Sequence, residues 1–327
     1  MPKRIVISKV GGPEVLKYED YNIATTLEDN SVRIKQSAIG LNYIDTYHRS
    51  GIYPLPSDPP VCPGIEAAGT IIKLGKKVNN LKVGDKVCYA STPLGAYCEI
   101  RDFPADKTIK IPPAISEDAA ASILLKGMTV EYLFERLYKI KKNEFILFHA
   151  VAGGVGLIAC QWAKSIGCNM IGTVSNDAKG KLALKNGCKY IINYKKENVQ
   201  KKVKEITNGK GVSVVYDGVG KDTFDESIKC LSTRGLMVSF GQSSGMVEKI
   251  DMHKTFNPKS LFYTRPSLMG YTLNREELIN CSNKVFDKMK KGDVKANIYK
   301  KFKLNEAEEA HKTLQSRKSY GSIILVP

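Results

Sequence analysis

The sequence predicts an α/β protein in which a β-rich N-terminal region precedes a doubly wound parallel sheet. Residues 1 to about 125 contain short apolar segments separated by Gly- and Pro-rich stretches such as "SGIYPLPSDPPVCPG", a pattern typical of strands and turns. From about residue 127, apolar strand segments alternate with helical segments, as in the β–α–β units of a parallel sheet. The length of 327 residues is too great for one simple core and favours two domains.

The alternation in the second region can be followed along the chain. We expect strands, each a short apolar run, at 145–149, 170–174, 190–192, 212–216 and 236–240. We expect one helix at 154–166, a second that ends at residue 186, a third that ends at residue 208 and a fourth near 224–231. From about residue 270 the pattern is mixed, and the chain ends in a predicted strand at 322–326.

The composition is that of an ordinary globular enzyme, with 43% hydrophobic and 25% charged residues. No apolar run approaches the roughly 20 residues that a membrane helix needs. The N-terminal segment "MPKRIVISKVGGPEVL" is too polar for a secretory signal. We therefore expect a cytoplasmic location and no membrane partner.

The chain has eight cysteines, and no two of them form a C-x-x-C pair. Several lie in apolar segments, such as Cys88 in "DKVCYA" and Cys160 in "LIACQW". This pattern favours free, buried thiols in a reducing compartment over a disulfide framework.

The formal net charge of +17 has two interpretations. One is binding to nucleic acid or to a membrane surface, and the other is a solvated, lysine-rich surface. The lysine clusters "YKIKKNE", "NYKKENVQKKVKE" and "FDKMKKGDVK" are dispersed, lack interleaved aromatic residues and mostly fall on predicted helix faces. The second interpretation is therefore favoured, and nucleic-acid binding stays open as an alternative.

The stretch "HAVAGGVGLIACQWAK" follows a continuous apolar strand and opens a predicted helix. Dinucleotide folds carry G-x-G-x-x-G at such a turn, and residues 151–156 here read Val-Ala-Gly-Gly-Val-Gly. Gly153 would let the backbone approach a pyrophosphate, and Gly156 would let the helix pack close to the sheet. Val151 replaces the first glycine, so we expect a slightly wider turn. Between a buried strand and a helix N-terminus, the motif indicates a dinucleotide site.

The end of the second strand of this region bears on which dinucleotide is bound. NAD sites place an acidic residue there to bind the ribose 2′-hydroxyl, and this sequence has Ser175. Asp177 keeps NAD open, although a carboxylate also suits a helix start. Lys179 is disfavoured in a first helical turn unless it meets a phosphate, and Tyr194, followed by two lysines, could close the same pocket. The pattern therefore predicts NADPH.

Segments spread over nearly the whole chain resemble one known family, in order. They are "GGPEVL", "AIGLNYIDTYHRSGIYP", "PGIEAAG", "LLKGMTVEYL", "FHAVAGGVGLIACQWAK", "INYKKEN", "VVYDGVG", "RGLMVSFGQSSG" and "YTRPSL". They are similar to the zinc-independent quinone oxidoreductases, the zeta-crystallin-like branch of the medium-chain dehydrogenase/reductases. The resemblance implies a GroES-like domain at 1–126, completed by 270–327, and a Rossmann domain at 127–269. It also implies an NADPH site in the cleft between them and hydride transfer from NADPH to a quinone.

The resemblance implies site residues wherever this sequence matches the family's motifs. The residues expected near the reacting ring are Asn42, Asp45, Tyr47 and Tyr53, with Thr129 beneath the nicotinamide. The residues expected at the pyrophosphate are Ala152, Gly153, Gly154, Val155 and Gly156. Those expected at the 2′-phosphate are Ser175, Lys179 and Tyr194. Those expected at the ribose and the nicotinamide amide are Phe240, Gly241, Ser243 and Ser244, and Arg317 should face the coenzyme from the returning C-terminal segment.

Related alcohol dehydrogenases hold a catalytic zinc, and this sequence lacks the ligands. The first ligand position falls at Asn42, the second at Ile65 and the third within 123–126, none of which offers a thiolate or an imidazole. The four histidines, at 48, 149, 253 and 311, are scattered and are expected to be isolated surface or packing residues. We therefore predict no metal. A quinone accepts hydride readily and yields a phenolate of low basicity, so positioning suffices, with Tyr47, Tyr53 and Asp45 donating or orienting hydrogen bonds.

Two other functions stay open on the same sequence. One is an NADPH-dependent reductase of α,β-unsaturated carbonyls on the same scaffold, where a donor would stabilise the enolate oxygen. The other, from a different class, is an RNA-binding or structural crystallin-like protein, as known for some members of the family. The resemblance also implies a homodimer formed through an edge strand of the parallel sheet, around residues 260–263.

Overall fold

The structure is a computed structural model that describes all residues from 1 to 327. The chain forms two compact units. The first unit contains Met1–Met128, Thr272–Gly292 and Ala296–Pro327. The second unit contains Thr129–Tyr271 and Asp293–Lys295. The N-terminal and C-terminal parts of the chain therefore share one unit, and the middle of the chain forms the other.

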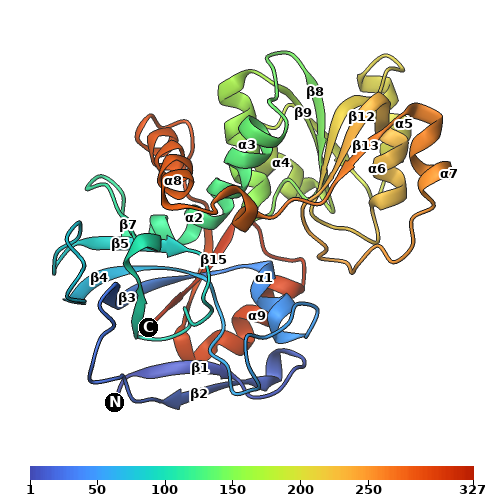
Figure 1. Ribbon diagram of the computed structural model, residues 1–327. Coiled ribbons are helices and arrows are strands. Elements are labelled where there is room, and N and C mark those ends of the chain that lie inside the picture. The colour runs from blue at the N-terminus through green and yellow to red at the C-terminus, as the bar shows by residue number, and fades with distance from the viewer. The chain divides into compact units, whose positions relative to one another are not determined.

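The second unit is built on a six-stranded sheet with the order β10-β9-β8-β11-β12-β13. The strands, all paired in parallel, are β8 (Phe145–Phe148), β9 (Asn169–Val174), β10 (Tyr190–Asn193), β11 (Val212–Asp217), β12 (Leu231–Ser239) and β13 (Phe262–Thr264). The helices are α3 (Gly154–Ile166), α4 (Asp177–Lys185), α5 (Val199–Ile206), α6 (Phe224–Cys230) and α7 (Met252–Phe256). Figure 1 shows α3 and α4 on one side of this sheet and α5 and α6 on the other. The predicted doubly wound parallel sheet is confirmed.

Burial explains why the strands of this sheet are continuously apolar. Ile146 and Leu147 of β8 and Val214 and Val215 of β11 have no exposed surface. A strand covered by helices on both faces cannot alternate polar and apolar side chains, so its sequence is one apolar run. The predicted strands and helices are found with similar ends, except that the strand expected at 236–240 begins at Leu231. α7, five residues long and without a clear periodic pattern, was not predicted.

The first unit carries a seven-stranded sheet with the order β14-β15-β3-β4-β5-β7, and β6 pairs with β3. Its strands are β3 (Ser31–Leu41), β4 (Glu66–Leu74), β5 (Lys86–Ala90), β6 (Ile100–Pro104), β7 (Ile109–Lys110), β14 (Ile298–Lys303) and β15 (Ser322–Val326). A separate hairpin pairs β1 (Lys3–Ile7) with β2 (Leu16–Asp20). The strand β15 runs antiparallel to β3, with Ile324 opposite Gly40, so the end of the chain completes this sheet.

Four helices belong wholly or mainly to the first unit: α1 (Tyr43–Arg49), α2 (Glu117–Glu131), α8 (Arg275–Lys290) and α9 (Ala307–Gln315). The helices α2 and α8 pack closely, because a Cβ on Gly127 would lie 2.7 Å from Cγ1 of Val285. No helix of the structure combines the length and the apolar composition that a membrane span requires. All eight cysteines are free thiols, as predicted, and all but Cys62 are buried.

Candidate functional site

The turn between β8 and α3 has the geometry of a phosphate-binding loop. Ala150 adopts a left-handed conformation with φ of 55°, which reverses the chain directly after the strand. The amide of Gly153 then donates to the carbonyl of Ala150 at 2.9 Å. Gly153 caps α3 in an extended conformation, with φ −75° and ψ 177°. The first amide groups of α3 have no partner within the helix, so the turn presents donors and the positive end of the helix dipole.

Gly156 fixes the distance between α3 and this turn. A Cβ at this position would lie 2.6 Å from the carbonyl oxygen of Ala150 and 2.6 Å from Cα of Val151. Because these atoms belong to the backbone, they cannot move aside as a flexible side chain would. Cys160 and Ala163, on the same face of α3, are completely buried. The small residues therefore bring the helix against the sheet, as expected for the third glycine of the motif.

Val151, at the place of the first glycine of the motif, is completely buried. Its amide donates to the carbonyl of Thr173 in β9 at 3.2 Å. A Cβ on Gly172 would lie 2.5 Å from Cγ2 of Val151, so the valine side chain fills the space that this glycine leaves open. The departure from the usual motif is thus matched by a glycine in the neighbouring strand.

A buried hydrogen-bond network that sequence reasoning missed lies behind the turn. Nδ1 of His149 is 3.0 Å from the Thr173 hydroxyl, which also accepts from the Ala150 amide. Nε2 of His149 is 2.9 Å from the Ser227 hydroxyl, which donates to Asp217 at 2.9 Å. Burial lowers the pKa of His149, so the ring is neutral and links β9 to α6 behind the turn. His149 is therefore not the isolated residue that the sequence suggested.

The four site residues predicted after β12 lie together in one loop. This loop is held to the loop after β11, because the Phe240 amide donates to the Asp217 carbonyl at 2.9 Å and the Ser243 amide to the Gly218 carbonyl at 3.2 Å. A Cβ on Gly241 would lie 2.7 Å from that same carbonyl of Gly218. The Ser244 hydroxyl donates to the Val219 carbonyl at 2.8 Å. Both loops lie at the carboxyl ends of parallel strands, where open α/β sheets bind ligands.

Asp177 is the residue that would bind the ribose hydroxyl if the coenzyme were NAD. Its carboxylate is paired with neighbouring side chains. Its Oδ2 atom pairs with Nζ of Lys196 at 2.6 Å, and its Oδ1 atom accepts from the Asn193 amide at 2.7 Å. The hydrogen bond from Lys196 is the main cause that lowers the pKa of this carboxyl. A ribose hydroxyl would have to compete with both partners for this carboxylate.

Lys179 lies in the first turn of α4 and is half-buried. Burial lowers the pKa of Lys179, and the charge of Lys195 lowers it further, so two cations lie near each other. The amide of Tyr194 donates to the carbonyl of Val174 at 3.1 Å, which holds Tyr194 against the end of β9, just before Ser175. The structure therefore gathers Ser175, Lys179 and Tyr194 at one edge of the second unit.

In the first unit, the predicted residues Asn42 and Asp45 form the start of α1. The backbone amide of Asn42 donates to Oδ2 of Asp45 at 2.9 Å, and the hydroxyl of Tyr97 donates to the same oxygen at 3.0 Å. Asp45 has no exposed surface, and its other oxygen, Oδ1, has no hydrogen-bond partner. Burial raises the pKa of this carboxyl from 3.8 to about 7.

Tyr97 connects Asp45 to a second buried network. Nη1 of Arg49 is 2.9 Å from Nδ1 of His311, and Nε2 of His311 is 3.0 Å from the Tyr97 hydroxyl. A guanidinium can only donate, so Nδ1 accepts and the ring proton sits on Nε2. Nε2–H therefore donates to Tyr97, whose own proton goes to Asp45. Burial, followed by the charge of Arg49, lowers the pKa of His311 to about 3. Because its ring contacts both Arg49 and Tyr97, this histidine is also not isolated.

The place where related enzymes hold zinc contains a buried ion pair instead. Nζ of Lys126 is 3.5 Å from Oε2 of Glu66, and both side chains are almost fully buried. The side-chain amide of Asn42 donates to the same oxygen at 2.7 Å, and the backbone amide of Leu125 donates to Oε1 at 2.7 Å. No group of three or more His, Cys, Asp or Glu side chains converges to hold a metal. The residues present do not fit zinc, because the expected ligand positions hold the amide of Asn42, the apolar side chain of Ile65 and, within 123–126, the ammonium group of Lys126, in place of thiolate and imidazole ligands.

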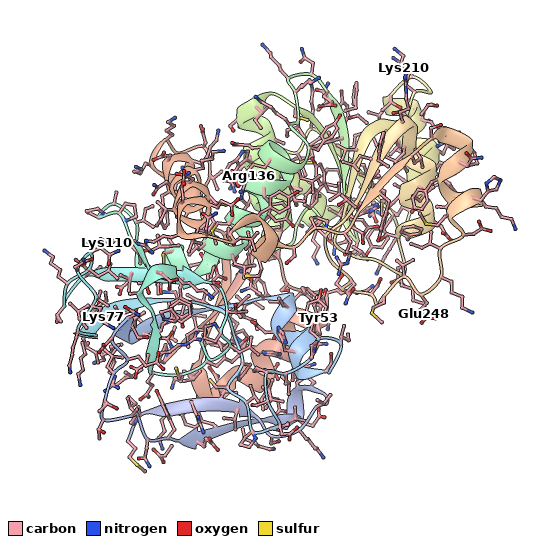
Figure 2. The ribbon with its side chains drawn as sticks, in the orientation of Figure 1. Tyr53, Lys77, Lys110, Arg136, Lys210 and Glu248 are labelled. Atoms are coloured by element: carbon pink, nitrogen blue, oxygen red, sulfur yellow. The ribbon has the colours of Figure 1, made fainter.

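Tyr47 and Tyr53 form an aromatic pair beside α1. Their ring centroids are 5.3 Å apart in an edge-to-face arrangement, and the Tyr53 amide donates to the Tyr47 carbonyl at 3.0 Å. Tyr53 lies in the loop that follows α1 (Figure 2) and is partly exposed, whereas Tyr47 is buried. Arg317 is exposed after α9, and its charge lowers the pKa of Tyr43 against the larger raising effect of burial. Thr129 is buried near the end of α2.

The chain matches two family models. One, described as Zinc-binding dehydrogenase, matches residues 154–290, and the other, described as Alcohol dehydrogenase GroES-like domain, matches residues 28–113. Quinone oxidoreductase 1 of Escherichia coli (strain K12) is 48% identical over 329 residues, with 100% of each chain covered. The chain belongs to the quinone oxidoreductase family. The predicted resemblance to this family, within the medium-chain dehydrogenase/reductases, is confirmed.

A solved structure and one further relative extend this comparison. The crystal structure of Escherichia coli quinone oxidoreductase complexed with NADPH has a TM-score of 0.97, with 99% of this chain and 100% of that chain covered. A 2-haloacrylate reductase from Burkholderia sp is 42% identical, with 98% of each chain covered. The GroES-like and Rossmann folds predicted from the sequence are thus those of the family.

Asp45 and His311 should give the stability opposite dependences on pH. Between pH 3.8 and about 7 the folded protein holds more protons on Asp45 than the unfolded chain does, so this contribution to stability is lost as the pH rises. Between about pH 3 and 6.5 the folded protein holds fewer protons on His311, so that contribution is lost as the pH falls. We predict that Asp45→Asn steepens the loss of stability on acidification from pH 6.5 to 4, and that His311→Gln reduces or reverses it.

The measurement is urea unfolding at a series of pH values for wild type and both variants. His253→Gln is the matched control, because His253 is exposed, and its curve should parallel that of the wild type. Parallel curves for all three variants would contradict the prediction.

Proposed function

We propose that the chain is an NADPH-dependent quinone oxidoreductase that transfers hydride from NADPH to a quinone without zinc. The coenzyme assignment rests on one edge of the second unit. There, Asp177 is paired with Lys196, and Lys179 and Lys195 lie near each other. A 2′-phosphate would relieve the repulsion between two cations and accept charge-assisted hydrogen bonds. The relative complexed with NADPH supports the same assignment.

The second unit would hold the nucleotide part of NADPH. The turn from Ala152 to Gly156, including Gly153, Gly154 and Val155, would bind the pyrophosphate through backbone amides. Ser175, Lys179 and Tyr194 would surround the 2′-phosphate. The loop with Phe240, Gly241, Ser243 and Ser244 would contact the ribose and the nicotinamide amide. This assigns coenzyme binding to residues 127–269.

The first unit, residues 1–126 with 270–327, would supply the groups near the reacting ring. NADPH, when bound, supplies the hydride. The edge-to-face rings of Tyr47 and Tyr53 would provide apolar contacts to a quinone, and their hydroxyls would donate to its oxygens. Asn42 and Asp45 would orient α1, which carries Tyr47, and Thr129 and Arg317 would contact the coenzyme. Lys126 supplies the positive charge that Glu66 requires, so no metal is needed to neutralise this carboxylate.

A substrate panel tests the function. Quinones and α,β-unsaturated carbonyls are compared at matched concentrations, with NADPH and with NADH, by following the oxidation of the coenzyme. We predict that kcat/KM for quinones with NADPH exceeds the value for the unsaturated carbonyls by about tenfold or more, since a quinone needs less oxyanion stabilisation. Addition of a chelator should leave the rate unchanged. Faster turnover of the unsaturated carbonyls, or loss of all turnover on chelation, would contradict the proposal.

The second candidate is reduction of α,β-unsaturated carbonyls, and the similarity to a 2-haloacrylate reductase favours it. In that reaction hydride goes to the β-carbon, and a tyrosine hydroxyl would stabilise the enolate oxygen. The same panel separates the two functions.

RNA binding is the alternative of another class. The lysine clusters are dispersed along the sequence rather than gathered in one segment, which supports the enzyme. With eight free thiols, we place the protein in the cytoplasm.

The coenzyme preference depends on Lys179. We predict that Lys179→Ala raises the Kd for NADPH about tenfold, because one charge-assisted contact to the 2′-phosphate is lost, and leaves the Kd for NADH within about twofold. The measurement is calorimetric titration with each coenzyme. Lys185→Ala, an exposed lysine in the last turn of the same helix, is the matched control. Equal losses for NADPH and NADH would count against a 2′-phosphate contact.

We also propose a homodimer formed through β13. This strand is the edge of the parallel sheet, and Phe262 on it is 62% exposed. An unpaired edge strand with an exposed aromatic residue is suited to pair with a second copy. We predict that Phe262→Lys shifts the protein from dimer to monomer in sedimentation velocity. The control Leu273→Lys changes an equally apolar side chain, 79% exposed and outside the sheet, and should leave the dimer intact. A monomeric wild type would refute the proposal.

A further inference from the structure

The first unit contains a pocket of about 300 Å³ that none of the proposed coenzyme or substrate residues lines. Five of its lining residues carry thiol, phenol or guanidinium groups: Arg4, Tyr21, Cys62, Cys98 and Arg101. They come from the β1–β2 hairpin and its continuation, from the segment before β4, and from β6 and the residues before it. Two thiols and two guanidinium groups at one pocket are a chemical combination that a structural role does not require.

Cys62 and Cys98 are neighbours in space. The Tyr97 amide donates to the Pro63 carbonyl at 3.0 Å, so the segments that carry the two thiols run side by side. Sγ of Cys62 is 3.5 Å from the Tyr97 carbonyl, which precedes Cys98 directly. Both thiols line the same pocket, and each affects the pKa of the other. The thiols are therefore close enough to react with one another after a local adjustment.

Two cations, Arg101 and Arg4, favour a thiolate at Cys98. Nε2 of Gln36, which donates to the Ala96 carbonyl at 2.8 Å, lies 3.3 Å from the Cys98 sulfur, and Tyr21, whose hydroxyl donates to the Ile100 carbonyl, lines the same pocket. The hydrogen bond from Cys62 is the largest cause that lowers the pKa of Cys98, and Arg101 and Arg4 lower it further against the opposing effect of burial. When neutral, the thiol can donate to the Gly95 or Ile100 carbonyl, each 3.3 Å away. Cys62 shows the opposite change, and its pKa is raised.

Arg101 adds a second, independent observation. Its side chain is only 7% exposed, and Nη2 donates to the carbonyls of Pro93 and Leu94 at 2.6 and 2.9 Å. Nη1 is buried and has no hydrogen-bond partner. A buried guanidinium N–H without a partner is costly, and an anion in the pocket would satisfy it. The charge of Arg101 therefore favours a negatively charged group at this place.

We propose that Cys98 is a peroxide-reactive thiolate and that Cys62 is its resolving thiol, so that the pair forms a reversible disulfide. In the first step the Cys98 sulfur attacks hydrogen peroxide. An S–O bond forms and the O–O bond breaks, and the released hydroxide takes one proton to give water and Cys98 sulfenic acid. In the second step the Cys62 sulfur attacks the Cys98 sulfur. The S–S bond forms, the S–O bond breaks, and the hydroxide takes the Cys62 proton and leaves as water.

The other cysteines provide a matched comparison. Cys168 is 5% exposed, close to the 4% of Cys98, so the two differ little in access. Burial raises the pKa of Cys168 to about 12, and no cation opposes this effect. At neutral pH Cys98 should thus carry far more thiolate than Cys168, and thiolate is the species that reacts with peroxide.

The test is to treat the fully reduced, full-length protein with hydrogen peroxide at pH 7 and to map the thiols by mass spectrometry over time. We expect Cys62 and Cys98 to disappear together, at least about tenfold faster than Cys168, with a linked peptide that a thiol reductant reverses. In Cys62→Ser, dimedone should trap the sulfenic acid at Cys98. In Cys98→Ser, Cys62 should stay reduced. Cys168→Ser should behave as wild type.

Arg101 variants separate chemistry from folding. Arg101→Gln should slow the loss of Cys98 about tenfold, and Arg101→Lys, which keeps the charge, should restore most of the rate. Circular dichroism of each variant shows whether it is folded, and Arg4→Gln, at a partly exposed position, serves if Arg101→Gln does not fold. Oxidation of Cys98 no faster than that of Cys168, or oxidation of Cys98 without a link to Cys62, would overturn the proposal.

Discussion

The contact between Gly156 and the backbone of Ala150 and Val151 is the constraint on which the second unit depends. A side chain at position 156 would push α3 away from the turn. The first amides of the helix could then no longer point at a phosphate bound there. The neighbouring strand contributes to this approach, since Gly172 makes room for Val151. Behind the turn, neutral His149 joins β9 to α6 through hydroxyl groups. The loop is therefore held from three directions before any coenzyme arrives, which reduces the ordering that binding would require.

The first unit also depends on a set of buried, hydrogen-bonded charges. Glu66 is satisfied by an ammonium group, a side-chain amide and a backbone amide at once, and this set ties β4 to α2 and to the start of α1. Asp45 caps α1 and connects through Tyr97 and His311 to Arg49. Such networks are costly when any member is removed, because each buried charge then loses its partner. They fix the orientation of α1, the helix that carries Tyr47.

The fold could be predicted from the sequence because its signals are local. Apolar runs of four to six residues mark the buried strands, and the glycines of one turn mark the start of α3. The buried networks could not be predicted, because their members are far apart in the chain. His149 and Ser227 are separated by 78 positions, Glu66 and Lys126 by 60, and Tyr97 and His311 by 214. A histidine that is isolated in the sequence gives no sign of partners that only the folded chain supplies.

The roles of individual site residues can likewise be predicted where they depend on neighbours in the sequence, and cannot where they depend on distant residues. Lys179 was singled out because a cation in a first helical turn is locally unfavourable, a property that can be read from a few residues. That Asp177 is engaged by Lys196 and Asn193 depends on β10 lying beside β9, which sequence spacing alone does not give.

The position of β15 has a consequence for how the polypeptide is made. Its residues Ile323 to Leu325 lie between β14 and β3, so the sheet of the first unit stays incomplete until residues 322–326 leave the ribosome. Residues 129–271, by contrast, contain every strand of their own sheet and can close it during synthesis. The strand β3 must wait through roughly 280 further residues, with one edge exposed, for its partner β15. A nascent chain truncated just before β15 would thus be a natural substrate for chaperones.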